Sequence, residues 1–179
     1  MDAVAREARV SKALVHYYFA TRDELIRAAF LYSDHRATTR IEAELVLEES
    51  GAERLARFLV LDLDDEPVFA ESRALWSEAW SLMRRDELLR PDVERLYRAW
   101  NDRLLGLLEE GQTDGSIPSH IDARGSAERL SALVDGLESQ LLLGLVTSEE
   151  ATEIVRSSID REFGQERAPA NRSDLGNVP

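Results

Sequence analysis

Apolar residues along this chain recur every three or four positions, and no stretch alternates apolar and polar residues for long. A spacing of three and four is the period of an amphipathic helix, whereas strict alternation is the period of a half-buried strand. Valine and isoleucine, which favour strands, are sparse. The pattern therefore predicts an all-α protein.

Cap and turn residues divide the chain into the expected elements. Ser11 is a suitable N-cap, and Thr21 with Glu24 three residues later forms a capping-box pattern. The expected helices cover residues 2–8, 11–19, 23–48, 52–63, 67–83, 91–110, 124–146 and 149–163. These elements are expected to divide the chain into a segment at 1–22, a helical domain at 23–163 and a mobile tail at 164–179.

The first forty residues differ in charge from the rest of the protein. The whole chain carries −13, but residues 1–40 hold seven basic and five acidic side chains, a net of +2. The remainder therefore carries −15. A locally basic segment in an acidic protein indicates binding of an anion at that segment.

Two short helices joined at Arg9 and Val10 have the layout of a helix-turn-helix, whose second helix enters the DNA major groove. Val15 and Phe19 are four residues apart and are expected to face inward. Their expected partners are Val4, Ala8 and Val10. This leaves Ser11, Lys12, His16 and Tyr17 on the outer face. Core filling is the alternative role of the aromatic triplet 17–19, and it is the role we expect for Phe19.

The stretch "VAREARVSKALVHYYFATRDELIRAAF" resembles the DNA-binding segment of TetR-family transcriptional regulators. The resemblance rests on an alanine-rich helix, a Val-Ser turn, an aromatic triplet ending in Phe and a polar restart. It implies a homodimer that represses transcription and leaves its operator when a small molecule binds. By resemblance, residues 1–22 form a helix-turn-helix DNA-binding segment and residues 23–163 form a helical effector-binding and dimerisation domain. The DNA-contacting residues that the resemblance implies are Ser11, Lys12, Ala13, His16, Tyr17 and Arg22.

Three positions depart from the family pattern. Arg9 replaces the usual turn glycine, Leu14 stands where a small polar residue often reads a base, and His16 stands where tyrosine is common. Family members also carry a helix before the segment that begins here at Met1, so the helix-turn-helix is expected to be incomplete. A dimeric effector-binding protein without DNA binding is the alternative function.

All three tryptophans lie between residues 67 and 104. Trp76 and Trp80 share one helical face, and Trp100 belongs to a second apolar stripe. These side chains either line a pocket for a cationic or apolar effector or fill a solid core. The candidate effector-pocket residues are Phe58, Trp76, Trp80, Met83, Tyr97, Trp100 and Leu104. Glu78 and the acids at 62–66 either favour a cation or form a solvated face.

Leucines cover most of the circumference of the expected helix 124–146, and such a helix must be covered on two sides. With the helix at 149–163 it predicts a four-helix dimer interface. The candidate interface residues are Leu130, Leu133, Leu137, Leu141, Ile154 and Ser158. The segment "LSALVDGLESQLLLG" resembles the BetI-like branch, whose regulators respond to choline-type effectors.

The remaining composition narrows the functional class. Cysteine is absent, so disulfides and thiolate chemistry are excluded. The N-terminus lacks a signal-peptide pattern and no apolar run is long enough to span a bilayer, so we expect a cytoplasmic protein without membrane partners. No Ser/His/Asp grouping, phosphate loop, paired carboxylates or metal-ligand spacing indicates an enzyme, a cofactor or a metal site.

Overall fold

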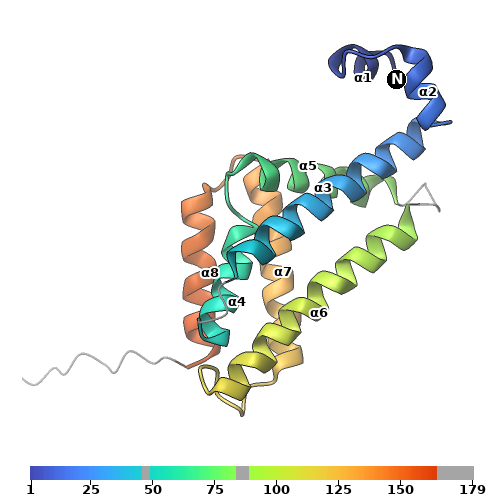
Figure 1. The fold of residues 1–179 in the computed structure, drawn as a ribbon. Coiled ribbons are helices and arrows are strands. Elements are labelled where there is room, and N and C mark those ends of the chain that lie inside the picture. The colour runs from blue at the N-terminus through green and yellow to red at the C-terminus, as the bar shows by residue number, and fades with distance from the viewer. Residues whose placement is uncertain (46–48, 84–88, 165–179) are drawn as a thin grey trace, which may run out of the picture. The chain divides into compact units, whose positions relative to one another are not determined.

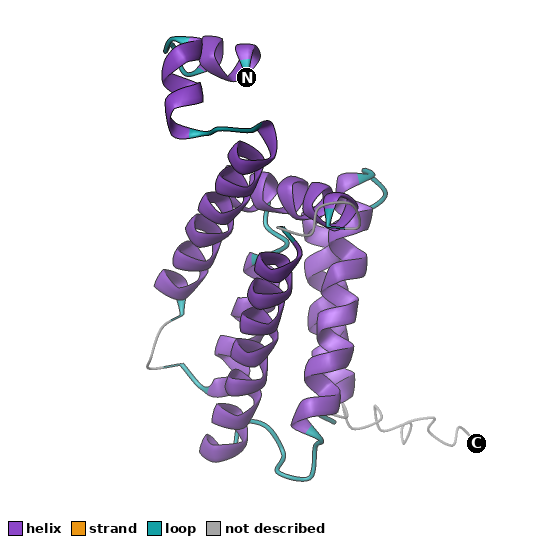
Figure 2. Ribbon diagram, turned by 90° about the vertical axis from the view of Figure 1, so that its right-hand side faces the viewer, coloured by secondary structure: helices purple, strands orange, loops and turns teal. Residues whose placement is uncertain are grey.

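The computed structural model describes residues 1–45, 49–83 and 89–164. Within these ranges every regular element is an α-helix and no strand occurs (Figure 2). The helices are α1 (Asp2–Glu7), α2 (Lys12–Tyr18), α3 (Arg22–Glu44), α4 (Gly51–Leu61), α5 (Pro67–Leu82), α6 (Arg90–Asp114), α7 (Ala123–Leu142) and α8 (Ser148–Glu162) (Figure 1). The all-α prediction is confirmed.

Three helix ends differ from the sequence-based expectation by four residues, and the other ends differ by at most two. α3 ends at Glu44; Leu45 is described outside the helix, and residues 46–48 of the expected range lie outside the described residues. α6 continues four residues beyond the expected end and stops before Gly115, whose φ is +82°. α7 stops at Leu142 because Gly144 adopts a left-handed φ of +67° and lets Leu145 N–H donate to Gln140 O. The expected tail at 165–179 also lies outside the described residues.

The chain forms two compact units. The first contains residues 1–44 and 64–100, and the second contains residues 45–63 and the chain from 101 onward. We call them unit 1 and unit 2. α6 contributes its first turns to unit 1 and its remainder to unit 2.

The core of unit 1 lies where α3 and α5 pack together (Figure 1). Its buried residues are Phe30, Ala79, Leu89 and Val93. Partly buried apolar side chains, including Leu31, Leu75, Trp76 and Met83, surround this cluster. Apolar positions three and four residues apart on three helices therefore meet in one cluster, as an amphipathic pattern requires.

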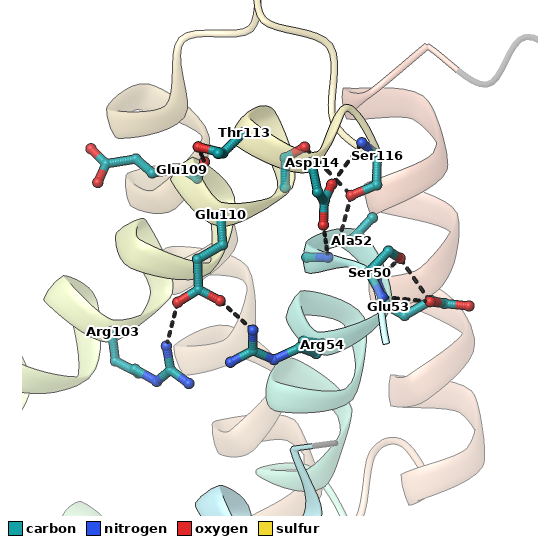
Figure 3. Close-up of polar contacts among 12 residues, drawn as sticks. Ser50, Ala52, Glu53, Arg54, Arg103, Glu109, Glu110, Thr113, Asp114 and Ser116 are labelled. Atoms are coloured by element: carbon teal, nitrogen blue, oxygen red, sulfur yellow. Dashed lines mark hydrogen bonds and ion pairs between the residues drawn. The ribbon is translucent and has the colours of Figure 1, made fainter. Parts of the chain in front are cut away.

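In unit 2, α8 packs against both α4 and α7. Its buried apolar side chains are Leu45, Leu55, Phe58, Leu59, Leu63, Leu104, Leu107, Leu108, Ile117, Ala127, Leu130, Val134, Leu137, Ala151, Val155, Ile159 and Phe163. Capping boxes open α4 at Ser50 and α8 at Thr147. Figure 3 shows the Ser50–Glu53 cap beside Asp114, which accepts a 2.6 Å hydrogen bond from Gly51 N–H.

None of the helices in the described ranges has the length and apolarity that crossing a bilayer requires.

Candidate DNA-contacting helix and effector site

The turn between α1 and α2 is built around Arg9, whose φ is +55°. This left-handed conformation is costly for a residue with a Cβ. The turn is closed by a 2.9 Å hydrogen bond from Val10 N–H to Ala5 O. Ser11 then caps α2, since its hydroxyl oxygen accepts from Leu14 N–H at 3.1 Å. The predicted turn and N-cap are confirmed.

Helix α2 buries only one side chain, that of Val15. Of its predicted partners, Val4, Ala8 and Val10 are exposed, and the buried residue of α1 is Ala5. The reason is that the turn closes over Ala5, which places the turn residue Val10 at the surface. Phe19, the C-cap of α2, is partly buried.

The side chains expected to contact DNA all lie exposed on α2 or next to it. They are Ser11, Lys12, Ala13, His16, Tyr17 and Arg22. Tyr17 is 80 % exposed and meets the ring of Tyr18 edge-on at 5.2 Å between centroids. Lys12 makes a 2.9 Å ion pair with Asp2 of α1. Leu14 is exposed beside them and offers an apolar contact in place of a polar one.

Three residues, 19–21, separate the end of α2 from the start of α3. Glu24 N–H donates to the Thr21 hydroxyl at 3.1 Å, and Glu24 Oε2 accepts from Ala20 N–H at 2.8 Å. The predicted N-cap at Thr21 is confirmed. In a capping box the Glu24 carboxylate would accept from the backbone N–H of Thr21, but here it accepts from the N–H of Ala20. Arg22 is the first residue of α3, and among the described residues it makes no ion pair.

Four aromatic rings form a continuous cluster in unit 1, which we call the aromatic cluster: Phe30, Trp76, Trp80 and Tyr97. Phe30 and Trp76 meet edge-on at 5.0 Å between centroids, Trp76 and Trp80 lie 5.7 Å apart, and Trp80 and Tyr97 lie 5.4 Å apart. Phe30 is fully buried, whereas Trp80 is 41 % exposed. The cluster therefore extends from the core of unit 1 to its surface.

Asp34 of α3 lies at the edge of this cluster. Its Oδ1 accepts a 3.2 Å hydrogen bond from the Trp76 indole N–H, and it makes no ion pair within the described ranges. Burial raises the pKa of the Asp34 carboxyl, against the lowering effects of the Trp76 hydrogen bond and of the charges of Arg95 and His35. The site thus holds a partly buried carboxylate beside an aromatic surface.

The expected effector-pocket residues are divided between the two units. Trp76, Trp80 and Tyr97 meet in the aromatic cluster, and Met83 packs against the neighbouring core. Trp100 belongs to unit 1 and is partly buried. Phe58 and Leu104 are fully covered core residues of unit 2.

The expected interface residues of α7 and α8 fall into two groups. Leu130 and Leu137 are covered within unit 2 by its own side chains. Leu133, Leu141 and Ser158 are only partly buried, and Ile154 is exposed. Leu142, Leu143 and Leu145 add further exposed apolar surface where α7 ends. A Cβ at Gly136 would meet nothing within 4 Å, so this face of α7 is open.

The acidic side chains of the described chain mostly serve structural contacts. In the run 62–66, Glu66 pairs with Arg40 and Asp65 pairs with Arg73. Unit 2 has a surface pocket of about 520 Å³ lined by Arg54, Gly106, Glu109, Glu110, Thr113 and Asp114. In Figure 3, Glu110 accepts from both Arg54 and Arg103. Among the described residues no group of His, Asp and Glu is arranged to hold a metal ion.

Two known protein families match this chain, one over its N-terminal helices and one over its C-terminal part. The family of bacterial regulatory proteins of the tetR type matches residues 1–29, and the C-terminal domain of BetI-type transcriptional repressors matches residues 51–164. The chain belongs to the TetR family.

Individual relatives agree with this assignment. The HTH-type transcriptional regulator BetI of Stenotrophomonas maltophilia is 27 % identical over 88 % of this chain and 79 % of its own length. A putative TetR-family regulator from Rhodococcus superposes with a TM-score of 0.79 at 29 % identity, covering 89 % of this chain and 85 % of the other. A putative regulator from Saccharomonospora viridis, solved in complex with choline, superposes with a TM-score of 0.82 at 26 % identity, covering 89 % and 84 %.

This TetR-family protein is a ligand-responsive transcriptional regulator with a BetI-type C-terminal domain. The match over residues 1–29 falls on the helix-turn-helix built by α1 and α2. The alternative, an effector-binding protein without a DNA-binding segment, is therefore not favoured.

Sequence reasoning did not identify Asp34 as a candidate site residue. It lies four residues after Phe30 on α3, beside the buried positions Ser33 and Ala37. A carboxylate bordering the buried face of a helix is a signal that could have been noticed, because such a group needs a partner. The partner itself, Trp76, comes from a different helix and could not be read from the spacing.

Proposed function

We propose that this regulator reads operator DNA with α2, pairs with a second copy through α7 and α8, and responds to an organic cation bound at the aromatic cluster. The proposal of a cationic ligand rests on Asp34. This carboxylate is partly buried, makes no ion pair in the described ranges and lies beside partly exposed tryptophan rings.

The DNA-reading role rests on the exposed face of α2. A recognition helix presents its N-terminal side chains to base edges, and cations next to it meet phosphates. Lys12 and Tyr17 supply groups for base edges, and Arg22 supplies a guanidinium for the backbone. Two such helices in a dimer suit a near-palindromic operator whose half-site centres lie about 34–36 Å apart or a multiple of that.

The dimer role rests on exposed apolar surface of unit 2. Leu142 ends α7, Leu143 and Leu145 follow it, and Ile154 lies exposed on α8. Apolar side chains gathered in this way usually mark an interaction surface. The open space at Gly136 supports close approach of a second helix. Leu130 and Leu137 contribute to the core beneath this surface instead.

The ligand class follows from the chemistry of the site. A cation gains from a carboxylate and from the negative faces of aromatic rings, and quaternary ammonium groups are often recognised by aromatic side chains. Asp34 offers the charge, while Trp76, Trp80 and Tyr97 offer the rings. The choline bound to the related regulator from Saccharomonospora viridis carries such a group and supports this proposal.

The test is a fluorescence titration of the protein with choline and with 3,3-dimethyl-1-butanol, a neutral compound of the same shape. Choline should bind and the neutral compound should not. Asp34→Asn and Trp80→Leu should each weaken choline binding by roughly tenfold or more. Glu78→Gln, which changes an exposed carboxylate on the same helix as Trp80, serves as the control and should leave binding unchanged.

The titration also separates the alternatives. Equal binding of choline and the neutral compound would favour an apolar effector. If neither compound changes tryptophan fluorescence and Trp80→Ala costs the roughly 3–5 kcal/mol of a core deletion, the aromatic cluster is a solid core and the proposal fails.

A further inference from the structure

Helix α2 presents a large apolar side chain on its outward face. Leu14 is 43 % exposed, whereas Val15, the buried residue of the helix, fixes the inward direction. Successive residues of a helix are about 100° apart, so Ala13 and Tyr17 lie opposite Val15 and Leu14 lies next to them. Leu14 therefore belongs to the surface that α2 presents to bound DNA.

The two edges of this outward face differ in chemistry. Lys12 and His16 lie one helical turn apart on one edge, and both carry nitrogen atoms that form hydrogen bonds. Leu14 and Tyr18 lie one turn apart on the other edge, and both are exposed. DNA that fits α2 must therefore offer polar groups to one edge and an apolar group to the other.

Leu14 is held in the first turn of α2 by the N-cap. Its N–H donates to the Ser11 hydroxyl at 3.1 Å, and Ser11 adopts the extended backbone of a capping residue. The first turn is the part of a recognition helix that meets base edges. The side chain of Leu14 has no hydrogen-bonding group, so it displaces water from the base edge opposite it without replacing the lost hydrogen bonds.

We propose that Leu14 selects thymine by packing against its C5-methyl group. This inference rests on the proposed DNA-reading role of α2. The thymine methyl is the apolar group of the major groove, and adenine, guanine and cytosine present hydrogen-bond donors or acceptors there. Desolvating such a group without a partner is unfavourable, whereas covering the methyl group is favourable. A T·A pair is thus the pair that suits this side chain.

The experiment replaces thymine by deoxyuridine, which lacks the C5-methyl group and keeps every hydrogen-bonding group of the base. Wild-type protein first selects a duplex from random sequences at low ionic strength, where phosphate contacts contribute most. Each thymine of the selected duplex is then replaced in turn, and gel-shift titrations measure the affinity. One replacement per half-site should weaken binding roughly three- to fivefold, as expected for one buried methyl group.

Leu14→Ala supplies the decisive comparison, because alanine is too short to cover the methyl group. The same replacement should leave the affinity of this variant unchanged. Cytosine and 5-methylcytosine at that position test the reverse change: methylation should strengthen binding by the wild type and have no effect on Leu14→Ala. The matched control is Val4→Ala, which shortens a side chain of similar exposure, 41 %, on α1. This variant should keep the full response to deoxyuridine.

Three outcomes contradict the proposal in distinguishable ways. If the wild type prefers a selected duplex but no deoxyuridine weakens its binding, the role of Leu14 is wrong while DNA reading by α2 stands. If the deoxyuridine effect persists in Leu14→Ala, a different side chain reads the methyl group. If the selection recovers no preferred sequence, the proposed DNA-reading role fails and this inference falls with it. The wild-type measurements decide the first and third outcomes even where Leu14→Ala loses its fold.

Discussion

The Trp76 indole N–H donates a 3.2 Å hydrogen bond to Asp34 Oδ1, and this bond joins α5 to α3. One neutral donor does not replace the water that burial removes from an ionised carboxylate. The pKa of Asp34 is raised for that reason, with burial as its largest cause. Ionised Asp34 therefore destabilises the folded protein.

The raised pKa of Asp34 predicts that the free energy of unfolding depends on pH. Because the folded-state pKa lies above the ordinary value, the folded protein binds more protons than the unfolded chain in the window above about pH 4. Stability therefore falls as pH rises through that window. Asp34→Asn should raise the free energy of unfolding at pH 7, and the gain should disappear at a pH below both pKa values. Urea unfolding at the two pH values measures this, and an equal effect at both would contradict it.

Arg9→Gly should stabilise the helix-turn-helix. Arginine at a φ of +55° pays a steric cost that glycine does not. We expect a gain of roughly 0.5–1 kcal/mol, read as slower amide exchange at Val10, whose N–H bonds to Ala5 O. Arg6→Gly removes the same charge from the interior of α1 and should have the opposite effect. Faster exchange in Arg9→Gly would exclude strain at the turn.

Gly51→Ala should destabilise unit 2. A Cβ at Gly51 would lie 2.3 Å from the backbone nitrogen of Gly111, so α4 and α6 would have to separate. Overpacking of this kind costs about 1–3 kcal/mol. Gly106→Ala on α6 is the matched control, because nothing lies within 4 Å of a Cβ there. It should gain up to about 1 kcal/mol from helix propensity. Similar effects from both substitutions, in thermal unfolding, would disprove the close contact.

Ile154→Glu should yield a folded monomer. Ile154 is 40 % exposed on α8, so a carboxylate there remains solvated in one chain but would be buried unpaired between two. Sedimentation should show the loss of the dimer while circular dichroism stays helical. Leu137→Glu, at a position only 2 % exposed, should instead unfold unit 2. A dimer that survives Ile154→Glu would place the interface elsewhere.

Lys12→Ala and Arg22→Ala should affect DNA binding differently. Arg22→Ala should weaken binding to all sequences alike and reduce the salt dependence by about one phosphate contact. Lys12→Ala should change base preference by roughly 1–3 kcal/mol if its contact is a guanine edge. Gel-shift titrations on a duplex obtained by random-sequence selection, and on a scrambled duplex, measure both. Asp2→Asn releases Lys12 from its ion pair and should strengthen binding.

The sequence by itself determined the all-α class and the position of most helix starts. Period and caps are local properties, so Ser11 and Thr21 could be identified as caps without knowing any neighbour. The exposed face of α2 followed in the same way, because a single buried residue, Val15, fixes which side of the helix faces outward. The end of α7 was misplaced because the sequence pattern continued through Gly144.

Only the tertiary structure decided which apolar and charged side chains meet. Leu137 and Ile154 both lie on apolar stripes, yet Leu137 is covered by its own chain and Ile154 is exposed. The difference arises because burial depends on which helix packs against each stripe. Asp34, Trp76 and Asp92 come from three helices separated along the chain by tens of residues. No helical period relates them, so the contacts Asp34–Trp76 and Arg27–Asp92 arise only when α3, α5 and the start of α6 pack together in unit 1.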